Sequence, residues 1–405
     1  MCATIMKYKS IFESENCLPE IERTNRFITV KSEEILAIDK FDMNNSKLLL
    51  GPLEAILVLT CDYVYVVKSV PEILKDKVYL DAKFKVHLRW MVISSFQNKK
   101  TAKLTDYQIR MVKGPHFLDL WTSNVAIYNK WLKVLKPLVL HDNFFDKYNI
   151  IEFLGSGCTA KVYKVVNKKT EKAYACKRFD KKEILDPSYL QTLTNEITIL
   201  TKLRDCPEVA KLIEVHETNN SVLIIMELMN GGRLTKQNII YSQDQIFTLT
   251  RCLLLIVNKM ASRGIIHKDL KPGNILIKNP KEEISYNNIK LIDFGFALQK
   301  PILTSGFSCM QSGTIGYVPP EVLDFKNTDI NCDFWDIYSI GVIIYSAMTG
   351  TRLFDNIDYK VKIELNRKGA INFEDKYFTA YPAECKLKSS KPDQRNVERE
   401  SPFSN

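Results

Sequence analysis

Short runs that alternate apolar with polar residues dominate the first third of the chain. The runs are rich in Val, Ile, Tyr and Phe, and they occupy residues 56–67, 77–86, 87–96, 107–114 and 117–123. This pattern is typical of half-buried antiparallel strands. In residues 123–136 the apolar side chains instead recur at helical spacing and include Trp131. The pattern therefore predicts many strands that are closed by one amphipathic helix.

A second pattern begins at residue 150. Three strand-like runs come first, at residues 150–155, 161–166 and 173–179, and a helical stretch and further strands follow. After Gly231 and Gly232 the pattern becomes mostly helical, with residues 242–264 as the longest expected helix. The chain is thus predicted to pass from a β-rich region into an α-rich one.

Composition sets broad limits on the function. The chain has 405 residues, 45% hydrophobic and 26% charged, which is typical of globular domains. A formal net charge of +10 is compatible with anionic partners such as ATP or phospholipid but selects none of them. We expect no nucleic-acid partner.

Cysteine usage and the absence of long apolar runs bear on location. The ten cysteines are scattered, without a CxxC pair or a histidine at zinc spacing, which argues against a disulfide framework and a structural zinc site. No signal peptide and no run of about 18 apolar residues is visible. We expect a reduced, cytoplasmic protein, with recruitment to membranes left open.

Five motifs follow one another in the second part of the chain. They read LGSGCTAKV at 154–162, AYACK at 173–177, IIHKDLKPGNIL at 265–276, LIDFGFA at 291–297 and SGTIGYVPPE at 312–321. Each has an ordinary structural explanation alone, but five in this order and spacing do not. Together they resemble the signature set of eukaryotic protein kinases. Lys271 and Thr314 resemble the serine/threonine type, similar to the CaMK and AGC groups.

The resemblance implies a fold and a division into domains. It implies an α+β, bilobal kinase fold over residues 148–375, with a β-rich N-lobe and an α-rich C-lobe, followed by an abbreviated end and polar tail at 376–405. The earlier strands and helix, at 26–138, resemble a pleckstrin-homology (PH) domain, a small β-sandwich or barrel. Residues 1–25 would be a flexible terminus and 139–147 a linker. Trp131 would then be the helix tryptophan of that family; the alternative is a core aromatic of some other small domain.

The resemblance also implies the cofactors ATP and Mg²⁺ and a set of residues that bind them. The residues implied to hold ATP are Leu154, Gly155, Ser156, Gly157, Cys158, Thr159, Ala160, Lys161, Val162, Ala175, Lys177, Met226, Glu227, Leu228, Leu276 and Asp293. Lys177 would neutralise the α- and β-phosphates and pair with Glu196. Asn274 and Asp293 would hold the metal, as oxygen ligands suit Mg²⁺.

The catalytic roles implied by the resemblance centre on one carboxylate. Asp269 would accept or orient the proton of the substrate hydroxyl, and Lys271 would contact the γ-phosphate. Thr314 would touch both side chains, and Asp336 would brace the catalytic loop from below.

Three departures from the family pattern carry expectations of their own. Lys268 replaces an arginine that pairs bidentately with phosphate, so we expect activity to depend weakly on phosphorylation of Thr304, Ser305, Ser308 or Ser312. Arg233 and Gly273 stand where acidic residues are frequent, which disfavours substrates with arginine before the phosphorylation site. Glu321 is expected to be a buried carboxylate, with Arg395 as its candidate partner.

These observations lead to a preferred function and to alternatives. The preferred function is a protein serine/threonine kinase. The alternative is a pseudokinase scaffold that uses both folds as binding modules, which the short C-terminus favours. A small-molecule kinase is disfavoured by the segment with Thr314 and Pro-Pro-Glu. The candidate lipid loop, residues 39–47, mixes charge signs, so phosphoinositide binding and protein docking both stay open for the PH-like region.

Overall fold

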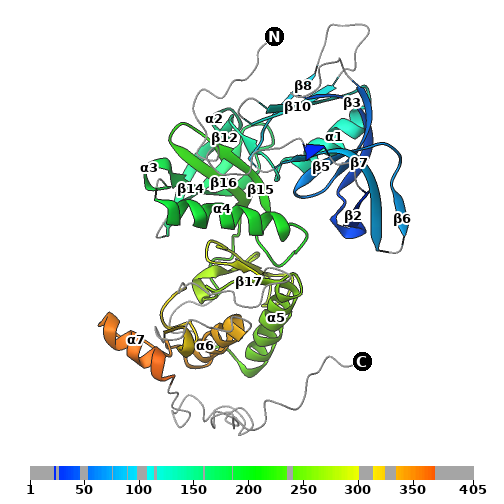
Figure 1. Cartoon of the computed structure of the whole chain (residues 1–405). Coiled ribbons are helices and arrows are strands. Elements are labelled where there is room, and N and C mark those ends of the chain that lie inside the picture. Colours follow the sequence, from blue (N-terminus) through cyan, green and yellow to red (C-terminus); the bar gives the residue numbers. More distant parts are fainter. Residues whose placement is uncertain are drawn as a thin grey trace. The chain divides into compact units, whose positions relative to one another are not determined.

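The computed structural model describes residues 22–23, 27–45, 53–74, 76–88, 90–97, 107–113, 116–157, 160–184, 186–234, 240–300, 313–323 and 334–369. The chain forms two compact units, Met1–Asn230 and Gly231–Asn405. Figure 1 labels their helices and strands. No helix within these ranges is both long and apolar enough to cross a membrane.

The first unit begins with a strand-rich region closed by a helix. Its elements are β1 (Glu22–Arg23), β2 (Phe27–Lys31), the 3-10 helix η1 (Ser32–Glu34), β3 (Ala37–Asn45), β4 (Leu53–Leu59), β5 (Tyr63–Val67), β6 (Glu72–Leu74), β7 (Lys77–His87), β8 (Val92–Gln97), β9 (Tyr107–Lys113), β10 (His116–Thr122) and α1 (Val125–Leu135). The predicted helix and most of the predicted strands are confirmed, but the run 87–96 forms a strand only from Val92 onward. The run 56–67 contains parts of two strands, because the chain turns between Leu59 and Tyr63.

These strands form an antiparallel array, and α1 packs against β3, β9 and β10. Neighbours follow the order β7-β5-β4-β3-β10-β9-β8, so β10 returns to pair with β3. Asn124 caps α1, and the helix buries Trp131 and Leu135 against the strands. The ring centroids of Trp131 and Phe41 lie 4.9 Å apart. The helix therefore supplies the aromatic centre of this core.

The interpretation of residues 39–47 as a loop is wrong for residues 39–45, which belong to β3. Phe41 and Met43 of this stretch are buried in the core. Asp39 accepts hydrogen bonds from Trp131 Nε1 at 2.7 Å and from Lys130 Nζ at 2.8 Å. The buried side chains of Phe41 and Met43 hold this segment in the sheet, and Asp39 binds Lys130 and Trp131 of α1.

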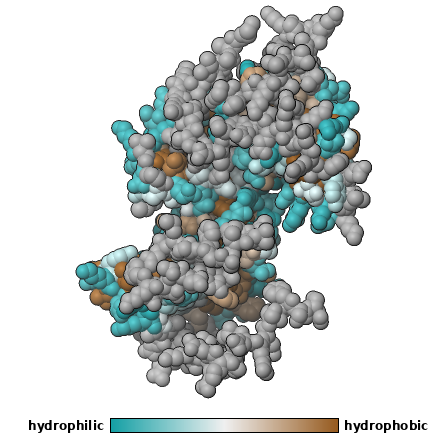
Figure 2. Space-filling model, in the orientation of Figure 1, coloured by the Kyte–Doolittle hydropathy of each residue, from teal (hydrophilic) through white to brown (hydrophobic). Residues whose placement is uncertain are grey.

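The rest of the first unit continues the same sheet. Its elements are β11 (Leu140–His141), α2 (Phe144–Lys147), β12 (Tyr148–Ser156), β13 (Lys161–Asn167), β14 (Ala173–Asp180), α3 (Lys181–Ile184), α4 (Pro187–Lys202), β15 (Leu212–Glu217) and β16 (Ser221–Glu227). The strands are ordered β8-β11-β15-β16-β14-β13-β12. β12 leaves apolar side chains such as Ile151 and Phe153 exposed. On the face of the molecule shown in Figure 2, hydrophilic residues cover much of the coloured surface and hydrophobic residues form smaller areas.

The second unit is mainly helical. Its elements are α5 (Gln243–Ala261), β17 (Ile265–Ile266), the 3-10 helix η2 (Pro272–Asn274), β18 (Ile275–Ile277), β19 (Ile289–Leu291), β20 (Leu298–Gln299), the 3-10 helix η3 (Pro320–Leu323), α6 (Trp335–Thr349) and α7 (Tyr359–Lys368). The helix expected over 242–264 is confirmed as α5. It begins after a capping box in which Ser242 and Gln245 satisfy each other's backbone groups.

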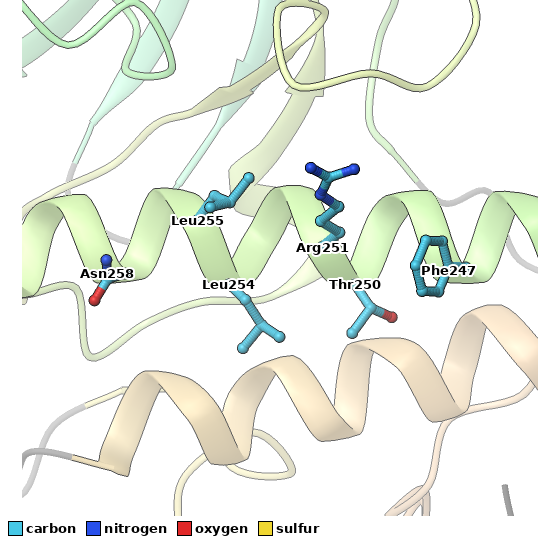
Figure 3. Close-up of a pocket in the computed structure, with 6 residues that line it drawn as sticks. All are labelled: Phe247, Thr250, Arg251, Leu254, Leu255 and Asn258. Carbon is cyan, nitrogen blue, oxygen red and sulfur yellow. The ribbon is translucent and has the colours of Figure 1, made fainter. Parts of the chain in front are cut away.

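One face of α5 is buried and packs beside α6, while another face stays exposed. Phe247 is 70% exposed, and Leu254 and Leu255 are 40% and 47% exposed. With Thr250, Arg251 and Asn258 they line a shallow hollow (Figure 3). α5 thus contributes to the core and also carries an open apolar surface.

Candidate active site

In the first unit, Lys177 and Glu196 form a buried ion pair. Lys177 Nζ lies 2.8 Å from each carboxylate oxygen of Glu196. Lys177 lies on β14 and Glu196 on α4, which starts at Pro187 behind the N-cap Asp186. Glu196 is fully buried and Lys177 nearly so. Two charges taken out of water are retained only where they hold each other closely, so the position of α4 governs the position of the ammonium group.

The glycine-rich motif forms the hairpin between β12 and β13. Gly155 pairs with Val162 and Ser156 with Lys161, and the amide of Gly157 donates to the carbonyl of Ala160 at 2.8 Å. A Cβ built on Gly155 would meet no atom within 4 Å, and one on Gly157 would meet only that carbonyl, at 3.9 Å. The backbone is therefore open to a ligand such as a phosphate chain, which fits ATP. Cys158 and Thr159 lie outside the described residues.

The residues expected near adenine lie on neighbouring strands of this unit. Ala175 of β14 pairs with Met226 of β16, and Glu227 and Leu228 follow directly. The carboxylate of Glu227 accepts a hydrogen bond from the amide of Lys211 at 2.8 Å. Glu227 thereby ties the end of β16 to the segment before β15. Leu276, the remaining expected residue, lies on β18 of the second unit.

In the second unit, three donors surround the carboxylate of Asp269. Thr314 Oγ1 donates to Oδ1 at 2.6 Å. Lys271 Nζ and Asn274 Nδ2 donate to Oδ2 at 2.8 and 3.0 Å. Lys271 Nζ also lies 2.7 Å from Thr314 Oγ1, so residues predicted from two separate motifs meet here. Asp269 is only 2% exposed.

Asp336 holds the backbone of the two residues that precede Asp269. Its two carboxylate oxygens accept from the amides of His267 and Lys268 at 2.8 and 2.9 Å. Burial raises the pKa of Asp336, and the two amide hydrogen bonds oppose that rise. Lys268 adopts a left-handed backbone with φ of 64°. Such a conformation is uncommon for lysine and costs free energy, of order 1–3 kcal/mol, that its surroundings must supply.

The side chain of Lys268 is buried against an aromatic ring. Its ammonium group lies 4.8 Å from the centre of the Trp335 ring. Burial lowers the pKa of Lys268 to about 8, while the carboxylate of Asp336 acts in the opposite direction. Lys268, which departs from the family pattern, therefore packs against the indole ring of Trp335.

Asn274 and Asp293 are the expected metal ligands. The amide nitrogen of Asn274 donates to both the carbonyl and the carboxylate of Asp269, so its oxygen is the atom left for a cation. Asp293 also has a left-handed backbone, with φ of 65°. Within the described ranges no group of three or more His, Cys, Asp or Glu side chains is arranged around a metal position. A carboxylate and an amide oxygen fit a hard cation that takes its other ligands from phosphates and water.

The segment beginning at Gly313 is fixed by residues that the sequence analysis missed. The side chain of Asn366, on α7, accepts from the amide of Gly316 at 2.7 Å and donates to the carbonyl of Val318 at 2.9 Å. Ser339 of α6 donates to the carbonyl of Tyr317 at 2.8 Å. Both side chains are buried. Asn366 is a single asparagine within a polar helix, and nothing in the sequence around it indicates that it is buried or which groups it binds.

The expectation that Glu321 is a buried carboxylate is wrong. Glu321 is exposed, because the short helix η3 turns Val322 and Leu323 into the core and leaves Glu321 outside. Its candidate partner Arg395 lies outside the described residues, as do Thr304, Ser305, Ser308 and Ser312.

Comparison with known proteins agrees with this geometry. The family model for the protein kinase domain matches residues 148–399. The chain is 27% identical over 330 residues to calcium-dependent protein kinase 5 of Plasmodium berghei, covering 78% of this chain and 52% of that protein. It is 33% identical over 239 residues to calcium/calmodulin-dependent protein kinase type 1 of Caenorhabditis briggsae, covering 58% and 63%.

A further relative is ribosomal protein S6 kinase alpha-2 of Homo sapiens, 33% identical over 230 residues, which cover 54% of this chain and 29% of that protein. The chain therefore spans less than two thirds of the length of each of these relatives. The family match itself covers more than half of this chain, and it contains every motif that meets around Asp269. The chain belongs to the protein kinase domain family.

Proposed function

We propose that this chain is a protein serine/threonine kinase, which transfers the γ-phosphoryl group of ATP to a hydroxyl group of a protein. The observation that carries the proposal is the environment of Asp269. A carboxylate offers about four acceptor positions, and Thr314, Lys271 and Asn274 use three of them. One position, on Oδ1, remains for the hydroxyl of a substrate.

The proposed step follows from this arrangement. The substrate oxygen attacks the γ-phosphorus, the bond to the bridging oxygen breaks, and ADP leaves with that electron pair. The hydroxyl proton passes to Asp269, which is held in place by its three donors. Lys271, which is bound to Asp269, would supply positive charge beside the transferred group.

The ATP phosphates need further positive charge. Lys177, oriented by Glu196, would supply it. Magnesium, when bound, would neutralise charge on the phosphates, and Asp293 and Asn274 would be its protein ligands. The relatives' names describe kinases that act with calcium or on a ribosomal protein, which supports a protein substrate for this chain.

Transfer of radiolabel from ATP tests the proposal against the pseudokinase scaffold. Wild type is compared with Asp293→Ala and with Asp355→Ala, which removes an exposed aspartate of the same unit. We expect label transfer by wild type and Asp355→Ala, and at least a hundred-fold less by Asp293→Ala. If wild type transfers no more label than Asp293→Ala, the scaffold function replaces the kinase function.

We further infer that residues 26–138 form a PH-like domain. The antiparallel order of β3 to β10 and the helix α1 with its buried Trp131 support this. A pull-down of the full chain with vesicles tests what the domain binds. Retention by phosphoinositide vesicles but not by phosphatidylcholine vesicles would assign a lipid ligand, and no retention by either would favour docking of a protein.

A further inference from the structure

Trp335, the first residue of α6, is a fully buried side chain that the proposed reaction does not use. Its Nε1 has no hydrogen-bond partner among the residues that the structure describes. A buried donor without a partner costs free energy, and an aliphatic side chain in the same place would avoid that cost. The ring is therefore expected to make an interaction that aliphatic side chains cannot make.

The ammonium group of Lys268 supplies such an interaction. Its Nζ lies 4.8 Å from the centre of the Trp335 ring, and Lys268 is buried. The face of an indole ring attracts a cation, and the attraction is stronger where water is excluded. Burial lowers the pKa of Lys268 to about 8, so the ammonium group still carries its charge at pH 7. Lys268 and Trp335 therefore form a buried cation–π pair.

The same ring borders the segment that carries Thr314. A Cβ built on Gly313 would lie 3.6 Å from Cζ2 of Trp335, and Ile315 packs against the buried cluster to which Trp335 belongs. The other buried members of that cluster are Ile266, Val318, Val322 and Leu323. The residues on both sides of Thr314 thus lie against Trp335 or its cluster.

Trp335 is thus joined to both sides of the hydrogen bond between Thr314 and Asp269. Lys268 directly precedes Asp269 in the chain, and Gly313 directly precedes Thr314. The hydroxyl of Thr314 lies 2.6 Å from Oδ1 of Asp269. The Cβ position of Gly313 would lie 2.7 Å from the carbonyl oxygen of Lys268, so the two backbones approach each other closely beside the ring. A change of the ring should therefore shift the hydroxyl relative to the carboxylate.

We propose that Trp335 is a positioning residue of the kinase site. Its ring holds Lys268 beside the segment that begins at Gly313. This contact places the hydroxyl of Thr314 on the carboxylate of Asp269, and the ring itself takes no part in phosphoryl transfer. The proposal deepens the proposed kinase function and rests on it for the effect on catalysis. Its structural content, the contact of the ring with both segments, can be measured without any catalysis.

Hydrogen exchange measures the contact in the full chain. Native-state exchange at pH 7 is followed in peptides that cover residues 313–323, for Trp335→Leu, Lys268→Met and the double variant. We expect both single variants to exchange faster. The double variant should exchange about ten-fold more slowly than the product of the two single effects predicts, as for a buried cation–π pair. Additive effects would overturn the proposal, because the ring would then act without Lys268.

Catalysis shows whether the ring acts through Thr314. Phosphorylation of a peptide substrate by the full chain is measured at varied ATP. We expect Trp335→Leu to lower kcat about ten-fold, the lower end of what loss of a hydrogen bond to a charged group produces, and to leave KM for ATP unchanged. Adding Thr314→Val to Trp335→Leu should then lower kcat little further. Losses that multiply would overturn the proposal, since the ring and the hydroxyl would then act separately.

Two further variants separate this role from a general loss of stability. Trp335→Phe keeps an aromatic face and should retain more of kcat than Trp335→Leu, so an equal loss in both would contradict a role of that face. Leu249→Ala truncates a fully buried side chain of α5 in the same unit, and its kcat per folded molecule should match wild type. If Leu249→Ala lowers kcat as much as Trp335→Leu, the effect is one of stability and the proposal fails.

Lys268→Met keeps the proposal testable if Trp335→Leu does not fold. It removes the same contact from the side of the cation and should lower kcat about ten-fold, so an unchanged kcat in this variant would overturn the proposal. Absence of phosphate transfer by wild type would instead refute the proposed kinase function. In that case the exchange measurements would still decide whether Trp335 and Lys268 hold the segment that begins at Gly313.

Discussion

The hydroxyl of Thr314 donates a 2.6 Å hydrogen bond to Oδ1 of Asp269. Thr314 belongs to the segment that begins at Gly313, and Asp269 lies 45 residues earlier, so the bond joins two parts of the chain that sequence motifs alone leave separate. The same hydroxyl lies 2.7 Å from Lys271 Nζ. The bond makes the orientation of the carboxylate depend on the placement of the later segment.

Replacing Thr314 tests that dependence. Thr314→Val keeps the shape and removes the donor, and a hydrogen bond to a charged group contributes about 1.5–3 kcal/mol. We expect kcat/KM for peptide phosphorylation to fall roughly ten- to hundred-fold. Thr314→Ser retains the hydroxyl and should stay within about three-fold of wild type. Equal loss in both variants would contradict this prediction, because the hydroxyl that Thr314→Ser retains would then not be sufficient for the role of Thr314.

From the lowered pKa of Lys268 we predict that the free energy of unfolding depends on pH. Burial lowers its pKa to about 8 from an ordinary value of 10.5, so between these values the unfolded chain binds more protons than the folded chain. The free energy of unfolding from this group therefore rises with pH in that window, by about 1 kcal/mol per pH unit. Denaturant unfolding from pH 8 to 10 measures it. Lys268→Met should lack this component, and equal slopes for both proteins would contradict the assignment.

The environment of Lys268 also bears on whether kinase activity depends on phosphorylation of the hydroxyl groups at residues 304–312. Its ammonium lies over the Trp335 ring, and a lysine cannot form the bidentate phosphate pair of an arginine. We expect alanine at Thr304, Ser305, Ser308 or Ser312, one at a time, to preserve phosphate transfer. Loss of turnover in any of these four variants would refute the prediction.

Gly313 is required by both its conformation and its surroundings. Its φ is 99°, and a Cβ there would lie 2.7 Å from the carbonyl oxygen of Lys268 and 2.9 Å from a methyl carbon of Val318. Gly313→Ala should destabilise the fold by roughly 1–3 kcal/mol and lower activity, because Thr314 is the next residue. Gly341→Ala is the control, since a Cβ on that helical glycine meets nothing within 4 Å. It should be neutral or stabilising by up to about 1 kcal/mol. Similar melting temperatures for the two variants would contradict this prediction.

Asn366 should matter for stability and activity although it lies far from Asp269 in the sequence. Asn366→Leu leaves the buried amide of Gly316 and carbonyl of Val318 without their partner, at about 1–3 kcal/mol for each unsatisfied group. Asn366→Asp keeps the acceptor for Gly316 and should lose less. Denaturant unfolding and peptide phosphorylation measure both effects. An Asn366→Leu variant with unchanged stability would show that water replaces these bonds.

Local pattern was enough to locate most of the elements. α5 begins where Ser242 and Gln245 form a capping box and buries residues at helical spacing, because caps and periodicity act over a few neighbouring residues. The strands that carry Gly155 and Lys177 likewise follow their apolar runs. The interpretation of residues 39–45 as a loop was wrong. Polar residues surround Phe41 and Met43 in this segment, and these two side chains are buried only because α1 packs against them.

The motifs indicated the protein kinase family, because their order and spacing resemble the signature set of that family, and the family model matches residues 148–399. The contacts that hold the motif residues in place arise from parts of the chain that are distant in sequence. His141 meets His216, and Asn366 meets Gly316. Glu321 faces solvent for the same reason, since its exposure depends on which neighbours η3 buries. Local periodicity carries no information on such pairings, which form only when the folded chain brings both partners together.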